Sequence, residues 1–270
     1  MCNNNGKVKK GDSKIMMRRI KIFISCIGVI MLLAPFVVFG QSNAQQPSLA
    51  NFDEDVAMSR RLIRQYCAIV QTMVPEASVD PEKQKKALGF LKEGIEKWAA
   101  VQKNYSTNPP AVYAKDPQFK ARLHDIANAL EDMLRALEAG QPRRSLLACG
   151  FGCGLCVTMH EENGLNYGVD KLFHLRKTAK TAQALLKTGH WEELKALIPR
   201  FLQQRDMVLL APLPWPDGDK RNDQYLEAVR DLSQTCYYLA LAINQNDRKK
   251  AAELLGGIVP IINKPYGLAL

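Results

Sequence analysis

The spacing of apolar residues constrains the fold of this 270-residue chain more than any other feature. Beyond residue 52, nearly every segment repeats apolar side chains at intervals of three and four residues, which is the period of an amphipathic helix. Alternating runs of β-branched residues, the signal of strands, are missing. Helices are therefore expected at about 53–73, 81–105, 117–139, 143–162, 168–188, 190–207, 222–245 and 247–262. The predicted fold class is all-α.

Short capping signals set the expected ends of two of these helices. Asp80-Pro81 and Asp116-Pro117 each place an aspartate at a capping position and a proline in the first helical turn. Gly140 stands where a glycine commonly ends a helix. We expect the second and third helices to begin at the two dipeptides, and the third to end just before Gly140.

The second half of the chain repeats the plan of the first half. When the sequence is shifted by 106 residues, apolar positions of the third and seventh expected helices superpose, and so do the proline-rich loops before them. The superposed pairs are Phe119 with Tyr225, Leu123 with Val229, Ile126 with Leu232, Met133 with Leu239, and Leu137 with Ile243. The repeat predicts two tandem four-helix-bundle-like units, at residues 45–164 and 165–270.

Residues 1–44 have the pattern of a secretory signal peptide. Basic residues between Lys14 and Lys21 precede an apolar run at 22–39, and Ser42-Asn43-Ala44 supplies small residues for cleavage. The run of 18 residues is close to the minimum for spanning a bilayer, so a retained membrane anchor is the alternative. We expect cleavage near Ala44 and a periplasmic or otherwise extracytoplasmic location, with membrane contact only through this segment if it stays uncleaved.

Most of the basic charge belongs to that segment. Removing it takes 7 of the 37 Lys and Arg residues and 1 of the 27 Asp and Glu residues, which leaves a net charge of +4. No run of basic residues with interleaved aromatics remains, so nucleic-acid binding has no support. No nucleophile with a neighbouring base, carboxylate pair or phosphate-binding loop is recognisable either. We therefore predict a non-enzymatic protein.

Cysteines form the most unusual pattern of the chain, in the segment "ACGFGCGLCVTMHEENG" at 148–164. On a helix, Cys149, Cys153, Cys156 and His160 share one stripe. Cysteines four apart on a helix do not readily bridge each other, so a disulfide needs a partner on another helix, and Cys67 is the candidate. Alternatively, thiolates and imidazole suit Zn or Cu(I). Five cysteines follow residue 44, an odd number that disulfides alone cannot use up.

The three glycines between these cysteines allow close contact with a neighbouring helix, or with a flat ligand lying against the backbone. The spacing of Cys153 and Cys156 is that of c-type haem attachment, but Val157 stands where the haem-binding histidine is required. Covalent haem is therefore not expected. A non-covalent haem held by His160 and a methionine remains an alternative, beside packing or a disulfide.

The order of four helices, a proline-containing loop after the second and a cysteine pair on the fourth resembles the helix-bundle cytochromes of the c-prime and b562 kind. The resemblance covers roughly residues 53–162. It implies bundles that have lost the usual cofactor attachment and kept a docking surface. The expected function is an interaction or scaffold subunit of an extracytoplasmic, redox-related assembly, with no cofactor. A Cu, Zn or haem protein for electron transfer or storage is the alternative.

One aromatic residue stands out in the second half of the chain. Trp215 lies among prolines in the loop "PLPWPDG". A tryptophan in such a loop is often an anchor for a protein partner. The alternative is that it covers its own bundle.

Overall fold

The computed structural model describes residues 46–76 and 78–270. The expected signal segment at 1–44 lies outside this part of the chain. The structure contains α1 (Leu49–Met73), α2 (Pro81–Tyr105), the short 3-10 helix η1 (Ala111–Tyr113), α3 (Phe119–Glu138), α4 (Pro142–Glu162), α5 (Gly168–Lys187), α6 (Trp191–Leu209), α7 (Arg221–Asn244) and α8 (Arg248–Leu268). The described residues hold no strand, so the all-α prediction is confirmed. None of these helices is long and apolar enough to cross a membrane.

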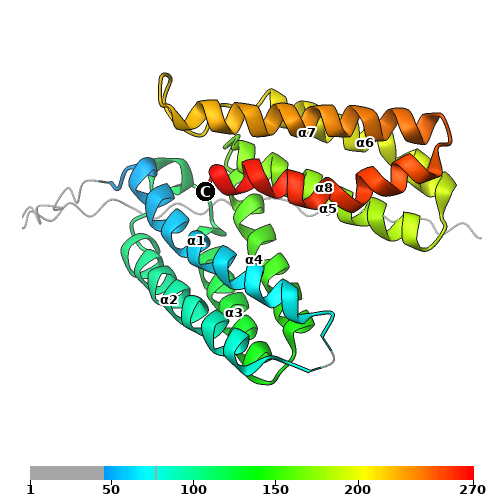
Figure 1. The fold of residues 1–270 in the computed structure, drawn as a ribbon. Coiled ribbons are helices and arrows are strands. Elements are labelled where there is room, and N and C mark those ends of the chain that lie inside the picture. Colours follow the sequence, from blue (N-terminus) through cyan, green and yellow to red (C-terminus); the bar gives the residue numbers. More distant parts are fainter. Residues whose placement is uncertain (1–45, 77) are drawn as a thin grey trace, which may run out of the picture. The chain divides into compact units, whose positions relative to one another are not determined.

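The eight helices form two rings of four. In the first, α1 packs on α2, α2 on α3, α3 on α4, and α4 again on α1. In the second, α5 to α8 contact one another in the same cyclic order. Figure 1 shows these two groups of helices. The prediction of two tandem bundle-like units is confirmed, whereas the exact domain boundaries stay a prediction.

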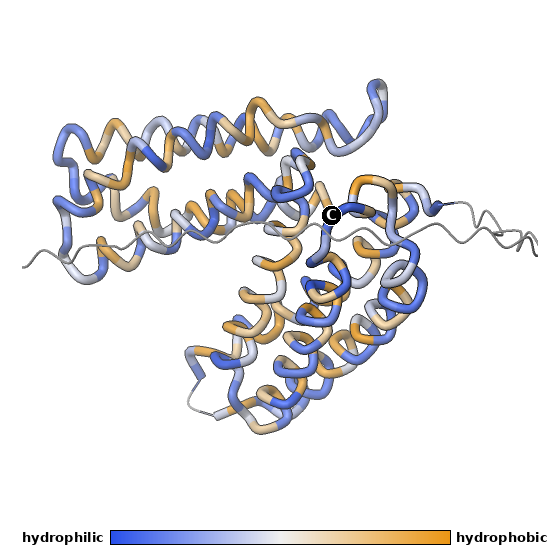
Figure 2. The backbone as a smooth tube through the Cα atoms, turned by 180° about the vertical axis from the view of Figure 1, so that it is seen from behind, coloured by the Kyte–Doolittle hydropathy of each residue, from blue (hydrophilic) through white to orange (hydrophobic). Residues whose placement is uncertain are grey.

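Each group of helices has its own core. One cluster of buried side chains joins α1 to α4 and includes Tyr66, Trp98 and Leu123. A separate cluster joins α5 to α8 and includes Leu172 and Leu239. All ten residues of the five superposed pairs are buried. Figure 2 shows how apolar and polar residues alternate along most helices, while α4 is apolar over much of its length.

Capping hydrogen bonds explain why the expected start of α2 is right and the expected start of α3 is wrong. Asp80 accepts hydrogen bonds from the backbone N–H groups of Glu82 and Lys83, so α2 begins at Pro81 as expected. Asp116 instead accepts from the backbone N–H of Gln118 in a turn, and α3 begins only at Phe119. The expectation that Asp116-Pro117 opens this helix is therefore wrong.

The last helix also differs from its expected range. It was expected to end near residue 262, but α8 continues to Leu268 through Pro260 and Pro265. Each proline removes a backbone hydrogen bond from the helix interior. Buried Ile262 and Tyr266 pack this turn of the helix against the second core and offset that cost.

Candidate functional site

The cysteines of α4 meet α1 at one point. The Cys67 Sγ lies 2.7 Å from the Cys149 Sγ, and the thiol of Cys153 hydrogen-bonds to Cys149. Cys67, Cys149 and Cys153 are half-buried, whereas Cys156 is buried. The structure thus brings the α1 cysteine to the first of the three α4 cysteines.

These thiols sit in surroundings that keep them protonated near neutral pH. The hydrogen bond to Cys149 and burial raise the pKa of Cys153 well above its ordinary value. Burial raises the pKa of Cys156 to about 12. For Cys149, the bond from Cys153 acts to lower the pKa, but the bond to Cys67 and burial outweigh it. Because the thiolate is the nucleophile and the metal ligand, each of these cysteines must lose its proton before it can take either role.

His160 does not join the cysteines. Its Nδ1 lies 2.8 Å from Asp170 Oδ2, and its ring packs edge-on against Tyr167, with centroids 4.9 Å apart. His160 is eleven positions beyond Cys149 in the sequence, which is a rise of roughly 16 Å along a helix. Among the described residues, no three His, Cys, Asp or Glu side chains are arranged to hold a metal ion. The stripe therefore shares a side of α4 without converging on one centre.

The glycines of α4 differ in what they face. A Cβ atom on Gly152 would lie 3.2 Å from the Cβ of Ala129, so this glycine lets α4 approach α3 closely. A Cβ atom on Gly150 or Gly154 would meet nothing within 4 Å. Close packing of α4 against α3 therefore explains the glycine at position 152, but not those at positions 150 and 154.

This difference gives a stability prediction. Gly150→Ala and Gly154→Ala should each raise the free energy of unfolding by about 1 kcal/mol, because glycine is that much less favourable than alanine inside a helix. Gly152→Ala should gain less or lose stability, because Ala129 must move. Urea unfolding of the three variants tests this ranking. Equal gains at all three positions would contradict the close approach of α4 to α3.

A cavity of about 180 Å³ lies beside the cysteines, between α1 and α4. Small residues form its wall on α4, including Gly150, Gly152 and Cys153, and they leave the space that larger side chains would fill. Its other walls are mostly apolar and include Ile63, Trp98, Ile126, Leu130 and Met133. An apolar cavity of 150 Å³ holds benzene, so this one has room for a single ring or a short alkyl chain.

Four cations line the same cavity: Arg60 and Arg64 from α1, and Arg176 and Lys180 from α5. No Asp or Glu side chain is among the residues that line it. Within the described part of the chain, none of the four forms an ion pair with a carboxylate. Arginines in such a setting are normally paired with a carboxylate, whereas here the charge of Asp170 acts on Arg60 only from beyond ion-pair distance.

Neutral groups hold the arginines in place. Arg60 donates to the Tyr266 hydroxyl at 3.4 Å, and Arg64 donates to the Asn263 carbonyl at 3.1 Å. Arg176 donates to the Asn263 side chain at 3.3 Å and lies over the Tyr266 ring, 4.3 Å from its centroid. Residues of α8 thus fix the guanidinium groups without neutralising them.

The cations also act on one another. The pKa of Arg64 is lowered, chiefly by burial and further by the charge of Arg176. The pKa of Lys180 is lowered by the same two causes. Both shifts disfavour the charged forms, so an anion bound beside Arg64 and Lys180 would offset the repulsion from Arg176.

Sequence reasoning missed these four residues, although a signal was present. Arg60, Arg64 and Cys67 follow the spacing of one helix face, and Arg176 and Lys180 are also four apart. The sequence does not show that α5 places Arg176 and Lys180 at the cavity beside α1. Asp170, the partner of His160, was missed as well, and nothing in its local sequence marks it.

Other concavities among the described residues gather no comparable set. A groove of about 1130 Å³ is lined by His160, Trp215 and residues of both charge signs. Trp215 packs edge-on against Tyr225 with Arg221 over its ring, so it covers its own bundle. The partner contact expected at Trp215 stays a prediction.

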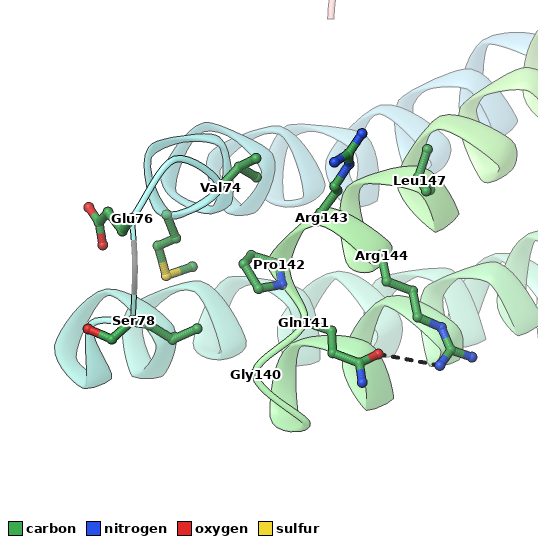
Figure 3. Close-up of a pocket in the computed structure, with 11 residues that line it drawn as sticks. Val74, Glu76, Ser78, Gly140, Gln141, Pro142, Arg143, Arg144 and Leu147 are labelled. Carbon is green, nitrogen blue, oxygen red and sulfur yellow. Dashed lines mark hydrogen bonds between the residues drawn. The ribbon is translucent and has the colours of Figure 1, made fainter.

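Another concavity, of about 490 Å³, lies where the α1–α2 loop meets the turn between α3 and α4. Figure 3 shows its two arginines pointing in different directions, with Arg144 hydrogen-bonded to Gln141. Its charged groups therefore do not converge on one point.

Comparisons with protein-family models, with curated proteins and with solved structures find no match for this chain. The resemblance to helix-bundle cytochromes therefore stays a prediction.

Proposed function

We propose that this chain is a non-enzymatic, extracytoplasmic binding protein for a small organic anion with an apolar body. A single observation carries the proposal: four cations line a mostly apolar cavity whose lining contains no Asp or Glu side chain. The proposal keeps the non-enzymatic and exported character expected from the sequence. It puts ligand binding in place of the scaffold role.

The two chemical parts of the cavity match the two parts of such a ligand. Trp98, Ile126 and Leu130 offer an apolar surface to the body of the molecule. The indole N–H of Trp98 is already satisfied, because it donates to the Leu123 carbonyl at 3.0 Å, so its ring acts as an apolar wall. Arginine side chains are the residues of choice for planar anions such as carboxylates.

The size of the cavity restricts the ligand. A volume of about 180 Å³ is near that needed for one aromatic ring and is small for a haem macrocycle. Helix bundles commonly build ligand sites between facing helices. If the resemblance to bundle cytochromes holds, the proposed ligand would use the interior of the bundle without a cofactor.

Thermal unfolding with matched probes tests the proposal. Phenylacetate and hexanoate should raise the melting temperature, because a ligand at a hundred times its Kd adds about 2.7 kcal/mol to the free energy of unfolding. Phenethylamine and 2-phenylethanol, with the same ring but a cationic or neutral head, should have far smaller effects. Equal stabilisation by the amine, or none by either acid, would overturn the proposal.

A further inference from the structure

We infer that Cys67 and Cys149 form a disulfide in the exported protein, and that Cys153, Cys156 and Cys236 remain thiols. This bond acts as a latch, by which we mean that it restrains α1 and α4 from separating at the wall of the cavity. The assignment of a latch rests on the proposed ligand binding, whereas the assignment of the disulfide rests only on the proposed export. Both cysteines line the cavity, one from α1 and one from α4.

Geometry selects this pair. The two sulfurs are 2.7 Å apart, so only a small movement brings them to the bonding distance of about 2.05 Å. Both residues are half-buried beside a cavity, which leaves them within reach of an exchange partner. A bond between them joins two helices that are 82 residues apart in the sequence.

The other cysteines are poor alternatives. Cys153 is four residues from Cys149 on the same helix, where side chains do not readily reach bonding geometry. Cys156 is buried in the first core, and Cys236 is buried in the second. One disulfide and three thiols therefore account for the odd number of cysteines.

The oxidation balances with an external disulfide. The Cys67 and Cys149 thiols lose two protons and two electrons as their S–S bond forms. The oxidant is a disulfide-bearing thiol oxidase of the extracytoplasmic space, whose own S–S bond breaks and takes up the two electrons as a dithiol. The intermediate is a mixed disulfide between that enzyme and one cysteine, which the other cysteine then attacks.

The position of the bond connects it to the ligand. Cys67 and Cys149 stand in the seam between α1 and α4, where small side chains leave the cavity open. Arg176 and Lys180 line the same cavity as both cysteines, so the pair lies next to the cationic lining. A covalent tie at this point restrains separation of α1 from α4. An anion held between these helices should therefore dissociate more slowly from the oxidised protein.

Thiol counting on the wild-type full chain, exported and purified without reductant, tests the disulfide. After denaturation and alkylation with iodoacetamide, three of the five cysteines of residues 45–270 should be labelled, and peptide mass mapping should find Cys67 joined to Cys149. Cys236→Ser should retain the bond and show two labelled thiols. Five labelled cysteines, or a bond that includes Cys153, would overturn the inference.

A second measurement tests the latch and separates it from the proposed function. Phenylacetate dissociation is measured on the oxidised protein and after reduction with a phosphine, and reduction should speed it. An unchanged dissociation rate overturns the latch. A disulfide in a protein that binds no phenylacetate contradicts the proposed function and leaves the disulfide standing. Binding without a disulfide overturns the inference alone.

Discussion

Glutamine in place of Arg176 is expected to weaken phenylacetate binding about 10- to 100-fold. A hydrogen bond to a charged group contributes about 1.5–3 kcal/mol, and each 1.4 kcal/mol is a tenfold change in Kd. Glutamine keeps a polar head that can still bond to the Asn263 side chain, but it removes the charge. Arg176→Lys keeps the charge and should lose less. Isothermal titration calorimetry measures the Kd of phenylacetate for the wild type, Arg176→Gln and Arg176→Lys.

Arg61→Gln is the matched control, because Arg61 lies on the same helix as Arg60 and Arg64 but does not line the cavity. It is paired with Glu54 at 3.0 Å and donates to the backbone oxygen of Leu270 at 2.8 Å. The control should bind phenylacetate as the wild type does. Equal losses in both variants would show that general positive charge, and not this cavity, attracts the probe.

Alanine in place of Asp170 is expected to cost about 3 kcal/mol of folding free energy, because it breaks a buried pair and leaves one partner behind. Asp170 is fully buried at the start of α5, and its Oδ2 faces the Nδ1 of buried His160 at the end of α4. Removing the carboxylate leaves this ring nitrogen without its hydrogen-bond partner away from water. Urea unfolding measures the loss.

The isosteric variant separates the hydrogen bond from the charge. Asp170→Asn keeps an acceptor oxygen that can face His160, so it should cost clearly less than Asp170→Ala. The second oxygen, Oδ1, has no hydrogen-bond partner among the described residues, so an amide NH2 in its place breaks no hydrogen bond there, but it leaves a buried donor unpaired and still costs some stability. If alanine proves as stable as asparagine, the His160–Asp170 contact does not hold α4 and α5 together.

The helices were predictable because their signals are local. Apolar spacing and the Asp80-Pro81 cap are read within a few residues, and α2 has the expected bounds. The continuation of α8 through Pro260 and Pro265 was not predictable, because it depends on packing against distant helices. Local rules stop a helix at such prolines, and tertiary contacts overrule them here.

The site was predictable only in part, for the same reason. Cys67 was expected near the α4 cysteines because the first and fourth helices of a bundle are neighbours, and it lies next to Cys149. A helical wheel places His160 on the same stripe but ignores the rise along the axis, which separates it from Cys149. Arg64 and Arg176 line the same cavity although they are more than a hundred positions apart in the sequence. The spacing of apolar residues carries no information about such long-range proximity.

A crystal structure of the protein grown with 4-bromophenylacetate would show whether an organic anion occupies the cavity between α1 and α4. Anomalous bromine density is expected among Trp98, Ile126 and Leu130, with the carboxylate turned toward Arg64 and Arg176. Bromine density only in the groove beside Trp215, or none in a protein crystallised at a saturating concentration, would contradict the proposed ligand binding.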